Sequence, residues 1–298
     1  MIVTIVGIGL IGGSLAKDLR RIKFATKVLG VDANAQNAAR ALELGIVDQV
    51  CALDEGVSQA DLVIVSTPVD VIEKVLPQVL DCVSPTTTVT DTGSTKVKVC
   101  EAVKNHPNRS NFVPSHPMSG TENSGPDAAL EGLFEKKITI ICDQEQSKPI
   151  HVALIEKMYH SIGMGIAYMS SDAQDHSTAH LSHLPHIVAF ALANAVLAKN
   201  ERDIIFDLAS GGFRSTARLA KSSPEMWGPI FKQNQKYVLE SLDVYIHHLK
   251  QFRDSIVNED QSLMYELMEN ANKIRPALEG NVSVMQKKEE QNLKLYTK

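Results

Sequence analysis

The chain has 298 residues, of which 44% are hydrophobic and 22% charged, and its formal net charge is −5. This is an ordinary globular composition, which excludes collagen-like, mucin-like and largely disordered chains. The negative charge is not that of a dedicated nucleic-acid or anionic-membrane binder, so we expect neither kind of partner. The length predicts about two domains.

Cysteine usage and the start of the chain bear on the compartment. The four cysteines are Cys51, Cys82, Cys100 and Cys142. They are too far apart for a CxxC redox pair or a zinc knuckle, and scattered thiols are typical of the reducing cytoplasm. No basic segment or cleavage site precedes the apolar residues at the N-terminus, so we predict a cytoplasmic protein without a signal peptide.

The first half of the chain alternates short apolar runs with helical patterns. Strands are predicted at residues 2–7, 28–32, 62–67, 88–92, 112–115, 138–142 and 166–169. The first three are almost continuously apolar, which is typical of strands buried on both faces of a parallel sheet. Segments with helical spacing, such as 14–21 and 38–44, lie between them. The alternation predicts an α/β domain of the Rossmann type, with a doubly wound sheet, over residues 1–169.

A glycine motif, Gly-Ile-Gly-Leu-Ile-Gly at residues 7–12, follows the first predicted strand and opens a helix. In the dinucleotide-binding fingerprint the first glycine permits a tight turn, the second lets the backbone approach a pyrophosphate, and the third allows close helix–strand contact. The N-terminus of the helix then faces the negative charge. A turn that merely favours glycine is the alternative. We assign a dinucleotide to Gly7, Gly9, Leu10, Ile11 and Gly12.

Asp32 bears on which dinucleotide binds. It ends the second predicted strand, 20 residues after Gly12. A carboxylate at this position accepts hydrogen bonds from a ribose 2′-hydroxyl and repels a 2′-phosphate. Ala33 and Asn34 follow it, and Arg40 is the nearest downstream arginine. We therefore predict NAD as the cofactor, with NADP less favoured.

Two further segments lie at the ends of predicted strands, where ligands bind in open α/β sheets. Ser66, Thr67 and Pro68 end the run at 62–67, and Gly93 and Ser94 follow the run at 88–92. Plain turns are the alternative for both. We assign Ser66, Thr67, Pro68 and Gly93 to the cofactor.

The second half is predicted to be all helical, with long helices at 171–198, 226–257 and 261–278 and no strand after residue 169. The most apolar stretch, 184–198, is shorter than the ~20 residues of a membrane span, so we expect a buried helix there. An apolar seam with spacings of 4, 3, 4, 3 and 4 consists of Val238, Leu242, Tyr245, Leu249, Phe252 and Ile256. Its period is that of helix-on-helix packing, within one subunit or across a homodimer. The amount of apolar helix favours a dimer, formed by a domain at 170–298.

Four polar segments remain in chain order. Ser-His-Pro-Met-Ser-Gly-Thr-Glu at 115–122 presents His116 at the end of a predicted strand, in a loop rich in glycine and hydroxyl groups. Ser-His-Leu-Pro-His lies at 182–186, Gly-Gly-Phe-Arg-Ser-Thr-Ala-Arg at 211–218, and Ser-Pro-Glu-Met-Trp at 223–227. An imidazole in such a loop is suited to meet a substrate hydroxyl, although a lone histidine is more often structural.

With Asp-Thr-Gly-Ser-Thr-Lys at 91–96 and the glycine fingerprint, these segments make the chain resemble the prephenate and arogenate dehydrogenases of tyrosine biosynthesis, from Met1 to about residue 250. The resemblance implies NAD(P)-dependent oxidative decarboxylation, of prephenate to 4-hydroxyphenylpyruvate or of arogenate to tyrosine. It implies an N-terminal nucleotide domain and a helical C-terminal dimerisation domain. Tyrosine, which resembles the substrate, is a candidate inhibitor. No residue in the sequence decides between prephenate and arogenate.

The resemblance also implies roles for individual residues. His116 matches the hydrogen-bond acceptor or base for the ring hydroxyl, and Ser94 matches the serine that orients that histidine and the hydroxyl. Thr121 follows in the same loop and is expected to contact substrate. Arg218 matches an arginine that clamps a substrate carboxylate with its planar fork. Without the resemblance, a helix-surface ion pair is the simpler interpretation of Arg218.

The histidine-rich helix admits two interpretations. His176, His180, His183 and His186 step by 4, 3 and 3 along one face. Such a stripe can bind zinc, but the family is not metal-dependent, so we predict no metal and a polar stripe facing the cleft. Ser182 and His186 are carried over as substrate-binding groups. Gly211 is expected to bring backbone close to the substrate side chain, and Trp227, otherwise a core residue, to lie beside it from its own or the partner subunit.

Two other functions compete with this one. A β-hydroxyacid or imine reductase of similar architecture places a catalytic lysine or aspartate on the long interdomain helix, where this chain has histidines. A non-catalytic NAD-sensing protein is the second alternative. Such a protein would not need His116, Ser94 and Arg218 together, so their joint presence favours an enzyme.

Overall fold

The computed structural model describes residues 1–198 and 211–279. By its internal contacts the chain divides into two compact units, Met1–Val238 and Leu239–Lys298. The first unit contains two sheets with the helices around them. The described part of the second unit is helical.

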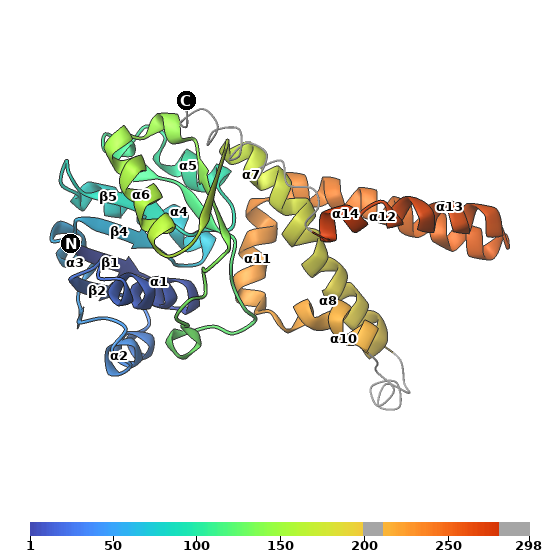
Figure 1. Cartoon of the computed structure of the whole chain (residues 1–298), viewed down its shortest axis with the longest axis horizontal. Coiled ribbons are helices and arrows are strands. Elements are labelled where there is room, and N and C mark those ends of the chain that lie inside the picture. Colours follow the sequence, from blue (N-terminus) through green and yellow to red (C-terminus); the bar gives the residue numbers. More distant parts are fainter. Residues whose placement is uncertain (199–210, 280–298) are drawn as a thin grey trace, which may run out of the picture. The chain divides into compact units, whose positions relative to one another are not determined.

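The larger sheet has six parallel strands in the order β3-β2-β1-β4-β5-β6 (Figure 1). Its strands are β1 Ile2–Val6, β2 Lys27–Val31, β3 Gln49–Val50, β4 Leu62–Val65, β5 Thr88–Asp91 and β6 Phe112–Val113. This is the strand order of dinucleotide-binding domains, in which the sheet grows outward in both directions from β1 and β4. The predicted doubly wound sheet is confirmed, with β3 as an additional short strand.

Helices cover both faces of this sheet, and β4 shows why. Leu62 and Ile64 pack into a core shared with α1 and α6, whereas Val63 and Val65 pack into a core shared with α3, α4 and α5. All four side chains are fully buried, as alternation along a central strand requires. The helices are α1 Leu10–Arg21, α2 Ala35–Glu43, α3 Leu53–Ser58, α4 Val69–Cys82, α5 Val97–Val103 and α6 Pro149–Ser161.

A second, three-stranded sheet has the order β7-β8-β9 and consists of Ser115–Pro117, Ile138–Cys142 and Gly165–Met169. Strand β7 is antiparallel to β8, and β8 is parallel to β9. The prediction of one strand at 112–115 is wrong. Pro114, which has no N–H to donate, lies between β6 in the first sheet and β7 in the second.

The helical region begins with a long continuous helix (Figure 1), in which a π-helical turn, Ala179–His183, joins α7 Ser171–Thr178 to α8 Leu184–Leu197. The remaining helices are α10 Gly211–Ala217, α11 Pro224–Gln233, α12 Gln235–Val257, α13 Gln261–Asn272 and α14 Arg275–Leu278. The predicted helix at 226–257 is therefore interrupted at Asn234, and the one at 261–278 is interrupted after Asn272. In the described part of the chain no strand follows β9.

The segment Ser171–Leu197 is long and apolar enough to cross a membrane by length and composition alone. Its α8 half is not buried as predicted: Ala189 is the one buried residue of this helix, and Leu197 is 48% exposed. The apolar composition of α8 predicts that it is buried. It does not show whether other parts of the same chain pack against it. On α12, Leu249 and Ile256 of the apolar seam are likewise exposed, by 50% and 63%.

Candidate active site at the carboxyl edge of the sheet

The glycine motif forms the turn from β1 into α1. Gly7 has a φ of +92°, and a Cβ there would lie 2.8 Å from the backbone of Ser66, so both conformation and space require glycine. A Cβ at Gly12 would collide with the carbonyl oxygen of Gly7. Gly9 is different, because a Cβ there would meet no protein atom within 4 Å. Packing explains Gly7 and Gly12. Gly9 is the N-cap of α1, which begins at Leu10 and Ile11, and the open space at Gly9 fits the phosphates of a dinucleotide.

Asp32 lies directly after β2, and its carboxylate is tied to the same turn. One oxygen accepts the backbone N–H of Ile8 at 2.9 Å, and the other accepts that of Asn34 at 2.9 Å. Each carboxylate oxygen retains lone pairs for a further donor, such as a ribose hydroxyl. Arg40 is held elsewhere, by Asp127 at 2.7 Å and Glu43 at 3.1 Å. The nearest downstream arginine that could neutralise a 2′-phosphate is therefore already paired.

The loops after β4 and β5 leave the sheet side by side. The N–H of Ser66 donates to Val6, and the hydroxyl of Thr92 donates to the hydroxyl of Ser66 at 3.1 Å. The hydroxyl of Thr67 is buried without a protein partner among the described residues, and Pro68 caps α4. These contacts bring the segments at 66–68 and 92–94 to one edge of the sheet, beside the glycine turn.

The buried carboxylate of Asp91 connects Lys96, the turn at Gly93 and strand β7 at Ser115. It forms an ion pair with Lys96, and both side chains are fully buried. The same carboxylate accepts the N–H of Gly93 at 2.9 Å and that of Ser115 at 3.1 Å. Asp91 therefore fixes the Gly93–Ser94 turn relative to the strand that carries the next residue, His116.

His116 is 8% exposed and lies in the middle of β7, opposite Ile140. Its Nδ1 lies 2.8 Å from the side-chain amide nitrogen of Gln174, and that nitrogen donates to the carbonyl of Ser94 at 3.2 Å. Ser94 is thus linked to the imidazole through its backbone and Gln174. Burial is the main cause that lowers the pKa of His116 to about 3, and Lys96 and His183 make smaller contributions in the same direction. The imidazole is neutral across the physiological range.

His183 repeats this arrangement on the π-helical turn. It is fully buried, and its Nδ1 lies 3.1 Å from the amide nitrogen of Asn234, which donates to the carbonyl of Asp175 at 2.7 Å. Burial lowers the pKa of His183 to about 4, helped by His186. The carboxylate of Asp175 accepts the N–H groups of Lys96 and Val97, and burial raises its pKa to about 6.

Trp227 links α11 to the histidine-rich helix. It is 6% exposed and packs with Val69 and Ile230, so the core interpretation holds for it. Its ring also stacks on His186, with centroids 3.5 Å apart, and meets His183 edge-on at 5.9 Å. Burial lowers the pKa of His186, and the charge of Arg218 contributes in the same direction, which places the exposed Arg218 within electrostatic reach of this pair.

The other substrate-side residues of the sequence analysis have more local surroundings. The carbonyl of Ser182 accepts the Nδ1 proton of His186 at 2.9 Å. The hydroxyl of Thr121 accepts the N–H of Asn123 at 3.2 Å within an exposed loop. Gly211 begins α10 at the surface. The structure thus gathers Ser94, His116, Ser182, His186 and Trp227 around α7 and α8. Among the described residues, no hydrogen bond or ring contact joins Thr121 or Gly211 to them.

The histidine stripe divides into two pairs. His176 and His180 face one another with ring centroids 4.9 Å apart, whereas His183 and His186 approach Trp227. Within residues 1–198 and 211–279, no group of three or more His, Cys, Asp or Glu side chains could hold a metal ion.

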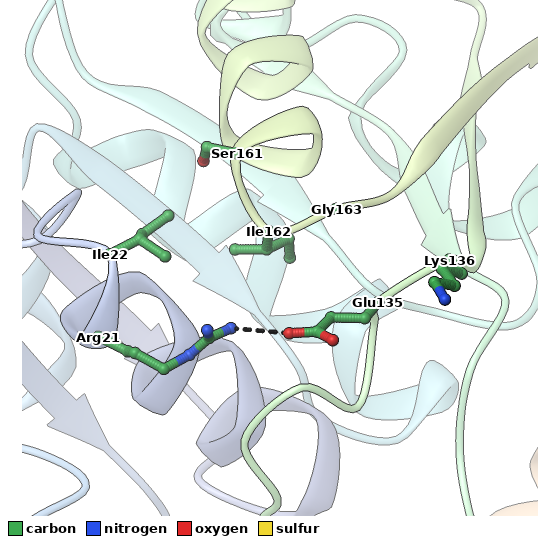
Figure 2. A pocket seen from close by; sticks show the side chains of 7 residues that line it. All are labelled: Arg21, Ile22, Glu135, Lys136, Ser161, Ile162 and Gly163. Carbon is green, nitrogen blue, oxygen red and sulfur yellow. Dashed lines mark hydrogen bonds and ion pairs between the residues drawn. The ribbon is translucent and has the colours of Figure 1, made fainter.

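A surface hollow lies at the far end of α1 from the glycine turn. It is lined by Arg21, Ile22, Glu135, Lys136, Ser161, Ile162 and Gly163. Figure 2 shows Arg21 and Glu135 pointing toward one another across it, with a closest approach of 3.4 Å. Because α1 begins at the carboxyl edge of the sheet, its last residue lies at the opposite edge. The hollow is therefore separate from the site around His116.

Several residues of this site were not assigned by sequence reasoning. Asp91 and Lys96 lie inside the quoted Asp-Thr-Gly-Ser-Thr-Lys segment, and an acid and a base bracketing a glycine turn are a usable signal. Gln174, Asp175 and Asn234 carry no local signal, because a polar residue in a helix does not reveal its distant partner.

Comparisons with known proteins match two successive parts of the chain to one family. Residues 15–168 match the family described as prephenate dehydrogenase, nucleotide-binding domain, and residues 170–270 match prephenate dehydrogenase, dimerization domain. The cyclohexadienyl dehydrogenase of Zymomonas mobilis is 33% identical over 282 residues, which cover 93% of this chain and 95% of that protein.

Two solved structures are similar over nearly their full length. The prephenate dehydrogenase of Aquifex aeolicus, in complex with hydroxyphenyl propionate and NAD+, has a TM-score of 0.85 at 33% identity, covering 93% of this chain and 98% of that chain. The arogenate dehydrogenase of Synechocystis has a TM-score of 0.76 at 31% identity, covering 93% and 100%. The family resemblance of the sequence motifs is confirmed, and the chain belongs to the prephenate dehydrogenase family.

Proposed function

We propose that this protein catalyses the NAD-dependent oxidative decarboxylation of prephenate to 4-hydroxyphenylpyruvate, with arogenate as the alternative substrate. The observation that carries the proposal is a buried, neutral His116 beside the Gly93–Ser94 turn, in a chain that matches this family over both of its domains. The related proteins act, by their names, on prephenate, arogenate or cyclohexadienyl substrates. Family membership counts against the β-hydroxyacid alternative.

The reaction breaks two bonds and keeps the hydroxyl proton. Hydride leaves the carbinol carbon, the ring carboxylate leaves as CO₂, and its bonding electron pair enters the ring, which becomes a phenol. NAD+, when bound, supplies the hydride acceptor. Because the product retains its hydroxyl proton, the reaction requires no net proton removal. We assign His116 as the acceptor of a hydrogen bond from the ring hydroxyl through Nε2, which steadies the developing positive charge on the carbinol.

The substrate carries two carboxylates, and we assign one of them to Arg218. A guanidinium binds a carboxylate with two parallel hydrogen bonds. The electrostatic reach between Arg218 and His186 supports a substrate that spans from the hydroxyl at His116 to a carboxylate beyond the His186–Trp227 stack. Ser94, Thr121, Ser182 and Gly211 are proposed as further substrate-side groups.

For the cofactor, NAD is favoured over NADP. The residues proposed to hold it are Gly7, Gly9, Leu10, Ile11, Gly12, Asp32, Ser66, Thr67, Pro68 and Gly93. The free carboxylate lone pairs of Asp32 and the pairing of Arg40 with Asp127 both support a ribose without a 2′-phosphate.

The protein is proposed to act as a homodimer in the cytoplasm. The dimerization family matched at 170–270 and the uncovered apolar surface of α8 and α12 support a second copy as the partner. Four free cysteines support a reducing compartment. Tyrosine is proposed as an inhibitor because it resembles the substrate.

A steady-state assay tests the proposed function. Purified protein is supplied with each combination of prephenate or arogenate and NAD+ or NADP+, and the absorbance of the reduced nicotinamide is followed. We expect turnover with NAD+ and at least one of the two substrates, and a lower kcat/KM with NADP+. An absence of turnover in all four combinations, with NAD+ still binding, would favour a non-catalytic NAD-sensing protein.

A further inference from the structure

Within the described residues, the amide of Gln174 is the hydrogen-bond partner of the His116 imidazole, at Nδ1. Gln174 is fully buried on α7. Its nitrogen lies 2.8 Å from His116 Nδ1 and 3.2 Å from the carbonyl oxygen of Ser94. Its oxygen is also buried and has no hydrogen-bond partner among the described residues.

The Ser94 carbonyl fixes which way this amide points. A carbonyl oxygen only accepts, so the atom of Gln174 beside it must be the NH₂ group. The second N–H of that group then points at His116 Nδ1, which must accept. A neutral imidazole that accepts at Nδ1 carries its proton on Nε2. The same logic applies to His183, whose Nδ1 faces the Asn234 amide anchored on the Asp175 carbonyl.

This protonation state does not suit the proposed reaction, in which Nε2 accepts a hydrogen bond from the ring hydroxyl. For Nε2 to accept, the ring proton must lie on Nδ1, and Nδ1–H requires an acceptor in place of the amide NH₂. Gln174 can provide one if its amide turns over, because its oxygen has no hydrogen bond to lose in the described part of the chain. One proton then leaves Nε2 and one is taken up at Nδ1 through water, so the charge of the ring does not change.

We propose that Gln174 is a positioning residue that sets the tautomer of His116, with its NH₂ group on Nδ1 in the free protein and its oxygen on Nδ1–H when substrate occupies Nε2. The inference rests on the proposed function of His116. Substrate binding is then coupled to the loss of the Gln174–Ser94 hydrogen bond. Nε2 of His116 therefore becomes an acceptor only when the ring hydroxyl of the substrate is present.

Burial keeps the ring neutral during this exchange, because it lowers the pKa of His116. Lys96 and His183 act in the same direction. Asp91 neutralises Lys96, and Asp175 faces the backbone of Lys96 and Val97. Because no carboxylate within residues 1–198 and 211–279 forms a hydrogen bond with the imidazole, the amide is the polar group that decides between the two neutral forms.

Two substitutions separate this role from a structural one. Gln174→Glu offers only acceptor oxygens when ionised, so it holds the proton on Nδ1 and raises the pKa of His116. We expect it to retain activity at alkaline pH and to acquire a new loss of kcat on the acid side, near neutral pH. Gln174→Met fills similar space but offers neither donor nor acceptor. We expect its kcat to fall on the order of 10- to 100-fold, as when an imidazole loses its outer partner, with the KM for NAD+ unchanged. Gln78→Glu, on the exposed surface of α4, is the matched control.

Nitrogen-15 NMR of the histidine rings tests the tautomer without relying on turnover. In wild-type protein we expect His116 to carry its proton on Nε2, and to move it to Nδ1 when NAD+ and 4-hydroxyphenylpyruvate are added. In Gln174→Glu we expect Nδ1–H from the start. A proton on Nδ1 in the free wild-type protein, an unchanged tautomer in the complex, or a Gln174→Met kcat within twofold of wild type would each overturn the proposal. If wild-type protein turned over neither substrate, the proposed function would fail, and the spectrum of the free protein would still decide the role of Gln174.

Discussion

The imidazole of His186 lies flat against the indole of Trp227, with ring centroids 3.5 Å apart and ring planes inclined by 25°. The ring of His186 is oriented by its Nδ1, which donates to the carbonyl of Ser182 one helical turn earlier. Neutral His186 therefore has a bare Nε2. The stack joins α8 to α11 and gives the proposed substrate cleft a rigid aromatic wall with an acceptor nitrogen.

Loss of this stack is expected to weaken substrate binding. An aromatic pair contributes about 0.5–1.5 kcal/mol beyond its buried area, so Trp227→Leu should raise the KM for substrate by about 2- to 10-fold. Trp227→Phe, which preserves an aromatic face, should raise it less. Steady-state kinetics with both variants measure the effect, with the thermal midpoint as a control for folding. Equal KM values for both variants and wild type would remove the stack from the substrate site.

The buried Asp91–Lys96 ion pair is expected to contribute strongly to the stability of the folded protein. Lys96→Met leaves the Asp91 carboxylate buried without its counter-charge, which typically destabilises a protein by about 3–5 kcal/mol. Asp91→Asn combined with Lys96→Met removes both charges and should recover part of that loss. Urea denaturation of the single and double variants measures the difference. A single variant no less stable than the double variant would show that the two side chains are not coupled.

Stability is expected to fall as the pH is lowered from 6.5. The pKa values of His116 and His183 are about 3 and about 4 in the folded protein and 6.5 in the unfolded chain, so between these values the unfolded chain binds protons that the folded protein does not. Each histidine then contributes up to about 1.4 kcal/mol per pH unit, a stability present above pH 6.5 and lost on acidification.

Asp175 acts in the opposite direction. Its pKa of about 6 lies above the ordinary value of 3.8, so between these values the folded protein binds the extra proton and offsets one histidine. Denaturation midpoints measured at intervals from pH 7 to pH 4 give the net slope. The slope should decrease in His116→Asn, and an unchanged slope would show that His116 titrates normally in the folded protein.

Arg218 is expected to act in binding rather than in folding, because it is exposed. Arg218→Ala should raise the substrate KM at least 10-fold, the loss expected when a charge-assisted bidentate contact is removed. Arg218→Lys keeps the charge but not the planar fork, and should restore only part of the affinity. Arg214→Ala, on the preceding helix, is the matched control. A lysine variant with the wild-type KM would argue for a simple charge effect.

The residues at the carboxyl edge of the main sheet could be predicted from the sequence, because the strands that end there are nearly continuous apolar runs. A parallel sheet gathers the carboxyl ends of such strands, so Gly7, Asp32 and Gly93 were expected to lie together. The pairing of strands was harder to predict from the sequence. Local patterns did not indicate that Pro114 separates a strand of one sheet from a strand of the other. The partners of the histidines were inaccessible for a similar reason. Gln174 meets His116 across 58 residues and Asn234 meets His183 across 51, and neither separation leaves a local pattern.

The central claim is that the cleft around His116 is the site of catalysis, and His116→Asn tests it most directly. Asparagine occupies similar space next to Gln174 but lacks the ring nitrogen that faces the hydroxyl. The measurement is kcat with the better substrate, together with the dissociation constant for NAD+. The account predicts that kcat falls by about 10²- to 10⁴-fold while NAD+ binding is unchanged. A variant that binds NAD+ normally and turns over at the wild-type rate would contradict it.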